Sequence, residues 1–407
     1  MTTSKHTAFL LGSGEFQLDV FKQLKQRNFQ VIICGPDLKF QISKDDIFLN
    51  CDVMDFKKIL EFSKNFTKKF AISSQTDITS EIVSKLNQEW GVYYTKPDEV
   101  IFYSNKTLLR ERVKKINSFF NPDFYKNFDD IKSIKKYISS NIYKHKTLVV
   151  KPAKSQSSRG VFKLDEQNYN AVFNNMKLFR KDYENAGLIL ESELVGDEIT
   201  IEGYKANSGA HHSLAISKKK KLKFGIANRL IYEFEISNKY SDVIKFNDNL
   251  YQNLEYGPTH SEYIKTKSGF KLVEAAARTG GTHIPSYILI NHIGINLESK
   301  LIDDITNPKL SINDFERIKV NNIIALCFYN QSGKMTKEPL NINNNVIFSK
   351  INVPIGTEPN NVTDDKSRHG YFIIMSASHE ELEETIKNIT ETVNNNYMQN
   401  GGILFWN

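Results

Sequence analysis

The first hundred residues alternate between short apolar runs and amphipathic segments. Residues 7–11 (TAFLL) and 29–34 (FQVIIC) are largely apolar, which is typical of strands buried on both faces. Between them, residues 16–27 have apolar side chains at helical spacing. A second round follows, with a predicted helix at 56–65 and a predicted strand at 70–73. Strands that alternate with helices predict an α/β unit built on a parallel sheet.

The pattern changes after this unit. A basic segment, 104–116, has helical spacing, and Ser104 is its expected N-cap. From Thr147 to about residue 268, short strands alternate with tight turns, which predicts antiparallel pairing. Two further strands and a helix over 379–396 are predicted beyond this region. We therefore expect an α/β domain over 1–100, an α+β region over 101–320 whose first lobe is about 101–190, and a C-terminal subdomain over 321–407.

Composition narrows the class of protein. The 407 residues are 40% apolar and 25% charged, as in ordinary globular proteins. Three cysteines without a CxxC pair argue for a reducing compartment and against a structural zinc site. A formal net charge of +7 suits a small anionic ligand but is too small to predict nucleic-acid binding. The apolar run 8–11 is too short for a signal peptide, and no apolar stretch approaches the roughly 18 residues of a membrane span. We expect a cytoplasmic protein with neither a nucleic-acid nor a membrane partner.

The glycines at 12–16 (GSGEF) predict a tight turn between a strand and a helix. A dinucleotide site has the pattern Gly-x-Gly-x-x-Gly, whose third glycine allows the helix to pack closely on the strand. Gln17 stands at that position here. The sequence therefore favours a structural turn over a nicotinamide cofactor.

A lysine at the end of a buried strand is the first candidate for ligand binding. Lys151 follows the apolar run 148–150, and a segment rich in serine, 153–160, comes directly after it. In this position an ammonium group can bind a phosphate while backbone N–H groups of the loop donate to the same oxygens. An ordinary hairpin loop with a surface lysine explains the same residues equally well.

Alternating carboxylates mark a second candidate. Glu198, Thr200 and Glu202 share one face of a predicted strand, and Ile199 and Ile201 share the other. The three polar side chains either line a cleft, where they accept hydrogen bonds from a sugar, or face solvent.

A predicted hairpin over 257–278 carries the strongest signal. If its turn is centred on Ser268, Glu262 lies directly opposite Glu274, with Cβ atoms about 5 Å apart. Like charges at this distance repel, so we interpret the pair as ligands of a cation, and hard oxygen ligands favour Mg²⁺ or Mn²⁺. Arg278 lies on the same face and can bind an anion near the metal. The alternative is an exposed hairpin whose glutamates are screened by lysines.

These segments together resemble the ATP-grasp superfamily, and within it the carboxylate–amine ligases related to L-amino acid ligases and carbamoyl phosphate synthetase-like enzymes. Five segments match in family order: Asn105-Lys106 at the start of the basic helix, 151–161 (KPAKSQSSRGV), 189–198 (ILESELVGDE), 257–264 (GPTHSEYI) and 272–281 (LVEAAARTGG). The resemblance covers about 1–400 and implies a parallel N-terminal domain, a two-lobed grasp and a small C-terminal part.

The resemblance also implies roles for single residues. It implies Glu262 and Glu274 as metal ligands, and Lys151 and Arg278 as catalytic residues. Many members have Asn where this chain has Ala276, which leaves the number of metal ions open. The implied nucleotide contacts, with the adenine at Glu191 and Leu194 and the ribose at Glu198, are Lys106, Lys151, Ser157, Ser158, Arg159, Gly160, Glu191, Leu194 and Glu198.

The implied activity is an ATP-dependent ligase with Mg²⁺ or Mn²⁺. A small-molecule carboxylate and a small-molecule amine are its expected partners, and a homodimer is compatible with this activity. Residues 154–159 are expected to close over the phosphates and to exclude water from an acylphosphate. Two alternatives stay open: another ATP-grasp reaction, such as carboxylation or phosphoryl transfer, and a regulatory nucleotide-binding protein weakened at Ala276.

Two groups of basic residues receive a structural interpretation. His211, His212, His260 and His283 could line a substrate site, but each is better explained by structure. The run Lys218–Lys221 is expected in a solvated turn, with at most one lysine on ATP.

Overall fold

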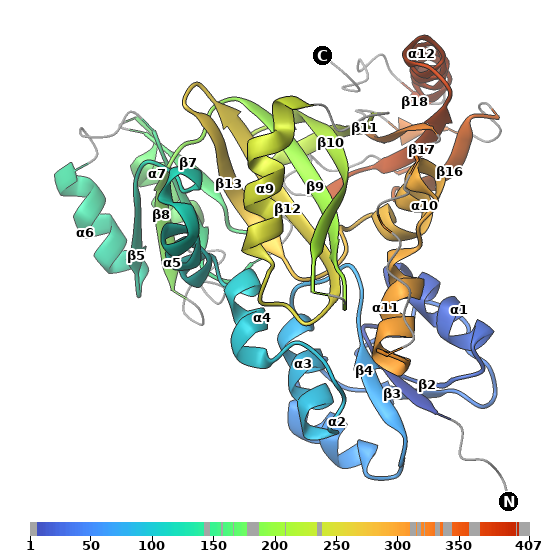
Figure 1. Cartoon of the computed structure of the whole chain (residues 1–407). Helices are drawn as coiled ribbons and strands as arrows, with labels where there is room; N and C mark the ends of the chain where they lie inside the picture. The colour runs from blue at the N-terminus through green and yellow to red at the C-terminus, as the bar shows by residue number, and fades with distance from the viewer. Residues whose placement is uncertain are drawn as a thin grey trace, which may run out of the picture.

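The computed structural model describes residues 6–398, with the exception of 142–146, 156–157, 166, 177–186, 208, 234–237, 310–314, 316–318, 321, 330–333, 337–343, 358–366 and 396. Three sheets of four or more strands organise these residues (Figure 1). The parallel sheet of the N-terminal part lies below the other two in this view.

The N-terminal sheet is parallel, as predicted, with the strand order β3-β2-β1-β4. Along β1, Ala8 and Leu10 face one apolar core while Phe9 and Leu11 face the other, because successive side chains of a strand alternate. Gln17 donates from its side chain to the carbonyl of Ser74 at 2.9 Å and fills the space beside Gly12, so the glycine turn is structural. The elements of this part are β1 (Thr7–Leu11), η1 (Glu15–Gln17), α1 (Leu18–Gln26), β2 (Gln30–Gly35), β3 (Ile47–Asn50), α2 (Phe56–Ser63), β4 (Lys69–Ile72) and α3 (Ser80–Glu89).

A second, four-stranded sheet has the order β5-β8-β6-β7, and its paired strands are antiparallel. The basic helix beside it is α5, and its N-cap is Asn105, whose side chain accepts from the amides of Thr107 and Leu108. The predicted cap, Ser104, is wrong because it is the last residue of the preceding helix. The elements are α4 (Pro97–Ser104), α5 (Lys106–Asn117), η2 (Ser118–Phe120), β5 (Tyr125–Phe128), α6 (Ile131–Asn141), β6 (Leu148–Pro152), β7 (Phe162–Leu164), α7 (Tyr169–Met176) and β8 (Leu188–Ser192).

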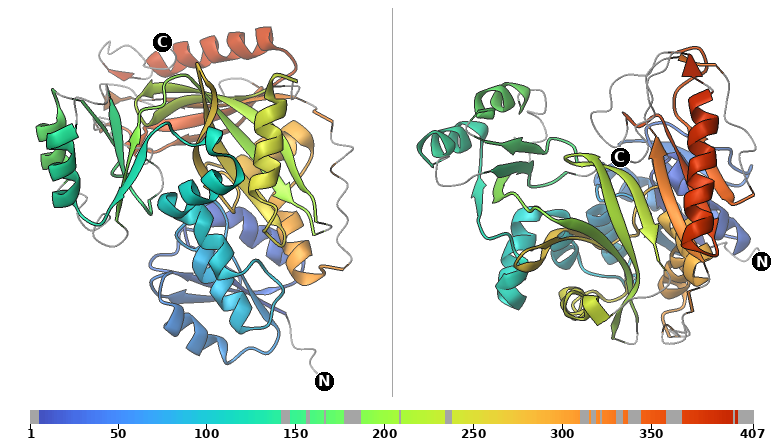
Figure 2. Two further views of the ribbon diagram at one scale, coloured as in Figure 1. Left: turned by 60° about the vertical axis from the view of Figure 1, so that its left-hand side comes forward. Right: turned by 90° about the horizontal axis from the view of Figure 1, so that it is seen from above.

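The largest sheet has eight strands in the order β13-β12-β9-β10-β11-β14-β17-β16, so the C-terminal strands extend it. Figure 2 shows the four-stranded sheet at one end of it and α12 at the other. The elements are β9 (Asp197–Lys205), β10 (His211–Lys223), β11 (Ile226–Tyr232), η5 (Asn238–Tyr240), α9 (Ser241–Leu250), β12 (Gly257–Thr266), β13 (Gly269–Ala276), the π-helical turn η6 (Ile284–Ile288), α10 (Leu289–Ile293), α11 (Leu297–Thr306), β14 (Ile323–Tyr329), β16 (Val346–Ile351), β17 (Gly370–Ser376) and α12 (His379–Asn395), with a separate pair, β15 (Lys334–Met335) and β18 (Tyr397–Met398).

The lysine run 218–221 lies within β10, which corrects the predicted turn. Because side chains of a strand alternate, Lys219 projects to the same face as its cross-strand partner Glu198. A solvated turn would have left all four ammonium groups in water.

Helix α11 connects the large sheet to the N-terminal sheet. Its residues Leu301, Ile302 and Ile305 are buried in the same core as Ala8 and Leu10 of β1. The edge of the N-terminal sheet where β1 and β4 end therefore faces residues that follow β13.

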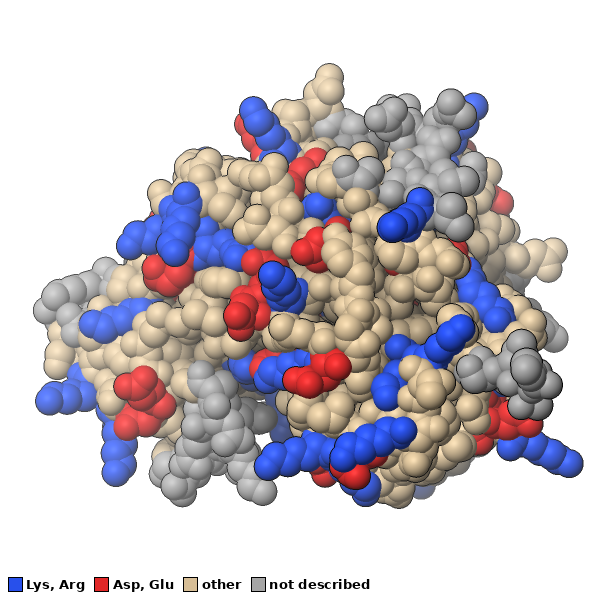
Figure 3. Space-filling view, turned by 60° about the horizontal axis from the view of Figure 1, so that its bottom comes forward, with Lys and Arg blue, Asp and Glu red and all other residues tan. Residues whose placement is uncertain are grey.

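Two surface properties bear on partners. Within the described part of the chain, no helix is both long enough and apolar enough to cross a bilayer. On the face that Figure 3 shows, lysine and arginine side chains are interspersed with aspartate and glutamate. A basic stripe of the kind that binds nucleic acid is not seen among the described residues of that face.

Candidate functional site

Three buried cations converge at the four-stranded sheet. Glu191 of β8 accepts from Arg110 Nε at 2.6 Å and from Lys151 Nζ at 2.6 Å. Lys151 reaches it because Val149 pairs with Glu191, and residues two apart on a strand share a face. The third cation, Lys106, donates to the carbonyl of Ser155 at 2.8 Å, and its Nζ lies 3.7 Å from Glu274. The two predicted phosphate lysines, Lys106 and Lys151, thus lie at one site.

The charge of Glu191 is fixed by its neighbours. Burial alone raises the pKa of this carboxyl, but the charges of Arg110 and Lys151 outweigh burial and lower the pKa to about 2. Burial lowers the pKa of Lys151, whereas Glu191 raises it. Both carboxylate oxygens of Glu191 are engaged, so its side chain holds Lys151 in place. A contact between Glu191 and adenine stays a prediction. Because both carboxylate oxygens are engaged, the backbone of Glu191 would have to make it.

The turn after the predicted adenine contacts, Glu191 and Leu194, depends on a glycine. Leu194 is half-buried, and the following turn contains Gly196 at φ +153°. A Cβ at Gly196 would lie 2.0 Å from the carbonyl oxygen of Lys265, so the close approach of the two backbones requires glycine. This turn leads directly into β9 and Glu198.

The loop predicted to bind phosphate is only partly described. Ser157 lies outside the described residues. Ser158 donates to the carbonyl of Gly225 at 2.7 Å, which joins the loop to the β10–β11 turn. Arg159 is exposed, and Gly160 is buried with a positive φ of 71°.

The hairpin of β12 and β13 has the predicted register at its functional end. Glu262 pairs with Glu274, and His260 pairs with Ala276. An irregularity between Glu262 and Tyr263 shifts the remaining pairs by one residue, so the turn is centred between Lys267 and Ser268 and not on Ser268 as predicted. Both glutamates are half-buried, and the Ala276 side chain is buried and offers no ligand atom.

Lys219 joins two of the predicted site residues, whereas the sequence predicted a solvated turn here, with at most one lysine of the run on ATP. Its Nζ lies 2.6 Å from Glu198 and 2.6 Å from Glu262. Burial lowers the pKa of Lys219, but the two carboxylates outweigh burial and raise it. Lys219 in turn holds the pKa of Glu262 well below its usual range, although burial alone would raise that pKa. The alternation of β10 was the available signal, and it was obscured by four consecutive lysines.

The polar face of β9 is buried, which removes the solvated alternative. Glu198, Thr200 and Glu202 are all less than one-tenth exposed. Glu202 contacts His260 Nδ1 at 2.8 Å. Burial lowers the pKa of His260, but Glu202 and Glu262 raise it to about 9. The Thr200 hydroxyl and one oxygen of Glu202 are buried without a hydrogen-bond partner. Buried polar groups of this kind are commonly satisfied by ordered water, an ion or a bound polar ligand.

The donor set fits one class of metal ion. No group of three or more His, Cys, Asp or Glu side chains capable of holding a metal is present among the described residues. Glu262 and Glu274 nevertheless place two carboxylates opposite each other. Mg²⁺ commonly takes one or two carboxylates and completes its shell with phosphate oxygens and water. The pair therefore fits Mg²⁺ brought in with a polyphosphate, and not an all-protein cage.

Arg278 is held by the N-terminal part of the chain. Its Nε and one terminal nitrogen donate to the two oxygens of Asp77 at 2.7 and 2.5 Å. Burial lowers the pKa of Arg278, but Asp77 outweighs burial and raises it. The guanidinium thus stays charged beside the β12–β13 hairpin, and the sequence did not reveal Asp77 as its partner.

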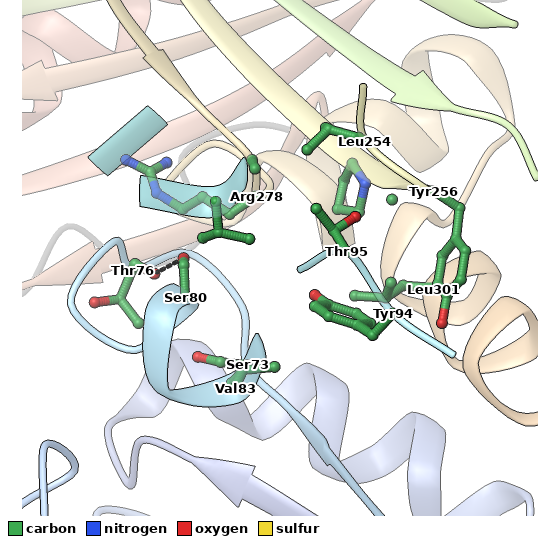
Figure 4. Close-up of a pocket in the computed structure, with 14 residues that line it drawn as sticks. Ser73, Thr76, Ser80, Val83, Tyr94, Thr95, Leu254, Tyr256, Arg278 and Leu301 are labelled. Carbon is green, nitrogen blue, oxygen red and sulfur yellow. Dashed lines mark hydrogen bonds between the residues drawn. The ribbon is translucent and has the colours of Figure 1, made fainter. Parts of the chain in front are cut away.

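A small cavity lies behind Arg278. Its volume is about 20 Å³, which is room for a single water and too little for a substrate. Figure 4 shows the guanidinium pointing away from this cavity, which is bordered by Ser73, Thr76, Ser80, Tyr94, Thr95 and Tyr256.

The other histidines have structural partners. His211 contacts Asp248 at 2.8 Å and Thr259 at 2.7 Å, and the ring of His212 packs on Phe315. His283 contacts Asp19 at 3.3 Å across the junction with the N-terminal sheet.

Comparison with known proteins identifies the fold. Residues 144–286 match the family model described as an ATP-grasp domain. The solved structure of an L-amino acid ligase from Bacillus licheniformis is similar over 96% of this chain and 98% of that chain, with 15% identity and a TM-score of 0.77.

Two synthetases share the architecture. Phosphoribosylglycinamide synthetase from Anaerococcus prevotii matches over 97% of this chain and 99% of its own, with 14% identity and a TM-score of 0.67. N5-carboxyaminoimidazole synthetase from Staphylococcus aureus, solved with ADP, matches over 95% and 97%, with 11% identity and a TM-score of 0.68. The sequence itself matches no curated protein significantly. At identities this low, the structural similarity establishes a common fold and nothing more.

Proposed function

We propose that this chain, whose residues 144–286 match an ATP-grasp domain, is an ATP- and Mg²⁺-dependent ligase that joins a carboxylate to an amine. One observation carries the proposal: the lysines of the four-stranded sheet meet the paired carboxylates of the large sheet, with Lys106 Nζ 3.7 Å from Glu274. Buried cations on one side and hard oxygen ligands on the other suit a triphosphate with its divalent cation.

The nucleotide roles follow from this placement. Lys106 and Lys151 donate to phosphate oxygens, and Ser158, Arg159 and Gly160 border the phosphates. Leu194 packs on the adenine, and Glu198 accepts from the ribose. Glu191 and Arg110 orient Lys151 through the two 2.6 Å contacts. Lys219 lies between Glu198 and Glu262, and it would be available to a phosphate oxygen if Glu262 held a metal ion.

Glu262 and Glu274 would hold the metal, with no contribution from Ala276. Mg²⁺ or Mn²⁺ bound there supplies charge neutralisation for the triphosphate. The protein would contribute two carboxylates, and phosphate oxygens and water would complete the shell.

The chemistry has two steps. A carboxylate oxygen of the first substrate attacks the γ-phosphorus of ATP, the bond to the β–γ bridging oxygen breaks, and ADP leaves with an acylphosphate formed. The amine then attacks the acyl carbon, phosphate leaves, and the nitrogen loses a proton. The side chains act by positioning and by charge, with Lys151 and Arg278 facing the transferred group. The near full-length similarity to an L-amino acid ligase supports amino acids as substrates.

The decisive experiment measures amine-dependent ADP release. The twenty L-amino acids are supplied singly and in pairs with ATP and Mg²⁺, and release that requires both an acid and an amine supports a ligase. Release with bicarbonate but without an amine would indicate a carboxylase. ATP binding without turnover under any condition would indicate a regulatory protein.

Glu262→Gln and Glu274→Gln test the metal ligands. Each variant should lose turnover by on the order of 100-fold at limiting Mg²⁺, because the phosphate charge is less neutralised in the transition state. Glu380→Gln, in the first turn of α12, is the matched control and should behave as the wild type. Wild-type turnover in both site variants would show that the hairpin does not hold the metal.

A further inference from the structure

Glu298 differs from every other buried carboxylate in the described part of the chain. Six Asp or Glu residues are less than one-tenth exposed there, and five of them pair with Lys, Arg or His. Glu298, at 1% exposure, forms no such pair. The five paired carboxylates are Asp46, Glu191, Glu198, Glu202 and Asp304.

One side of Glu298 is satisfied and the other is not. Its Oε1 accepts from the Ser74 hydroxyl and, at 3.4 Å, from the Gln75 amide. Its Oε2 is buried without a hydrogen-bond partner. Burial of an unpartnered carboxylate oxygen costs free energy, so a donor is missing from this position.

The electrostatics call for a cation. Burial raises the pKa of Glu298 to about 7, and the charge of Asp19 adds to this effect, while hydrogen bonds from Ser74 and Gln75 lower the pKa only in part. An ammonium group placed against Oε2 would stabilise the ionised form and satisfy the free oxygen at once.

Glu298 is also linked through Ser74 to the segment that carries Arg278. Ser74, its hydroxyl partner, contacts the Thr279 hydroxyl at 3.0 Å, and Thr279 directly follows Arg278. The same loop after β4 carries Asp77, which holds Arg278. Loops at the carboxyl ends of parallel strands are where ligands bind in open α/β sheets.

The backbone around this point is unusual. Among the described residues, five that are not glycine have positive φ. Three of these lie here: Gln75 at 59°, Thr282 at 55° and His283 at 61°. His283 donates its amide to the Gln75 side chain at 3.0 Å, so the strained positions support one another. Strain of this kind is retained most often at functional sites.

We propose that Glu298 binds the ammonium group of a substrate and thereby selects amino-bearing substrates over their uncharged analogues. The proposal rests on the proposed ligase function for the identity of the reacting groups. The ammonium belongs either to the acid that is activated, as in an amino acid, or to the amine that attacks, and the two are separated by experiment.

The test compares wild type with Glu298→Gln, which keeps the shape and the Ser74 contact but removes the charge. Hydroxylamine, which is largely uncharged at pH 7, traps an acylphosphate as a hydroxamate and so reports activation of the acid alone. Alanine and phenylalanine are compared with their des-amino analogues, propionate and hydrocinnamate. Ligation of the same acids to varied amino acids reports the second substrate.

The variant should raise KM for the ammonium-bearing substrate by about 10- to 100-fold, as expected for loss of a charged hydrogen bond, with KM for ATP changed less than about twofold. A loss of the preference for alanine over propionate in hydroxamate formation assigns the ammonium to the acid. A loss in ligation alone assigns it to the attacking amine. Unchanged KM values for both substrates would overturn the proposal.

Two controls keep the outcomes distinct. Asp304→Asn removes a buried carboxylate from the same helix, one that is paired with Lys300, and should leave substrate preference unchanged. If the wild type shows no turnover, the ligase function fails on its own, and calorimetric binding of phenylalanine and hydrocinnamate then decides the ammonium site. Tighter binding of phenylalanine that is lost in Glu298→Gln supports the site, and equal or absent binding refutes it.

Discussion

Glu191 and Glu298 show how neighbouring charges set the state of one side-chain type. Both carboxyls are almost fully buried. Glu191 lies between Arg110 and Lys151, and although burial opposes ionisation its pKa falls to about 2. Glu298 has no cation beside it among the residues that the structure describes, and burial raises its pKa to about 7. The Glu191 carboxylate stays ionised and positions Lys151. The Glu298 carboxyl titrates near neutral pH, and a bound cation would favour its ionised form.

We therefore expect the free energy of unfolding to depend on the ionisation of Glu298. Its folded-state pKa of about 7 is raised above the ordinary 4.5, so the folded protein binds more protons than the unfolded chain between these values, and stability falls as pH rises through the window. Glu298→Gln has no such loss. Relative to wild type it should gain roughly 3 kcal/mol at about pH 8 and little at about pH 4.5. Urea denaturation at both pH values measures the difference, and an equal effect at both would contradict the prediction.

We expect the replacement of Lys151 to weaken nucleotide binding. Lys151→Ala removes a charged hydrogen bond to phosphate, so ATP should bind about 10- to 100-fold more weakly. Lys163→Ala, on the neighbouring strand and paired with Glu193, is the control and should bind ATP as the wild type does. Calorimetry with a non-hydrolysable ATP analogue makes the comparison, and equal affinity in the two variants would argue that Lys151 only neutralises Glu191.

At the scale of elements, the turn between β8 and β9 depends on one backbone contact. Gly196 has φ +153°, and a Cβ there would meet the Lys265 carbonyl at 2.0 Å. Gly209, in the β9–β10 turn, also has a positive φ of 106° but has no atom within 4 Å of an added Cβ. The pair separates backbone strain from steric conflict.

Gly209→Ala should cost about 1–3 kcal/mol through backbone strain alone. Gly196→Ala should cost at least about 1 kcal/mol more and should weaken ATP binding as well, because the clash moves the start of β9 and Glu198. Chemical denaturation and nucleotide titration of both variants check this. Equal losses of stability in the two variants, with unchanged ATP affinity, would mean that the β8–β9 turn adjusts without moving Glu198.

At the scale of the whole molecule, the N-terminal sheet shares its core with α11. Ile302 is fully buried in that core, and Leu382 of α12 is fully buried in the core at the other end of the large sheet. Ile302→Ala and Leu382→Ala should each cost about 2–5 kcal/mol.

The two substitutions should reduce the protection of backbone amides from hydrogen exchange in different parts of the molecule. Ile302→Ala should increase hydrogen exchange in β1, β2 and β4 and loosen the Arg278–Asp77 and Ser74–Glu298 contacts, with a fall in turnover. Leu382→Ala should increase exchange in β14 and β17 and leave turnover nearly unchanged. Exchange mapped by mass spectrometry decides, and the same pattern in both variants would mean that the cores unfold together.

The sequence by itself determined the elements and one piece of the site. Apolar periodicity located the parallel sheet and the antiparallel strands, because it depends on residues close together in the chain. The pairing of Glu262 with Glu274 was predictable for the same reason: a short turn brings neighbouring strands into register. The assignment of Lys106 and Lys151 to one site depended on the ordered motifs of the ATP-grasp resemblance.

Only the tertiary structure decided what surrounds these groups. Lys219 reaches Glu262 over a separation of 43 residues, Arg278 reaches Asp77 over 201, and Ser74 reaches Glu298 over 224. No periodicity relates such positions, since they meet only when two sheets and α11 pack together. The lack of a cation beside Glu298 could not be predicted from its neighbours in the sequence. It depends on the side chains of every element that packs around the carboxylate.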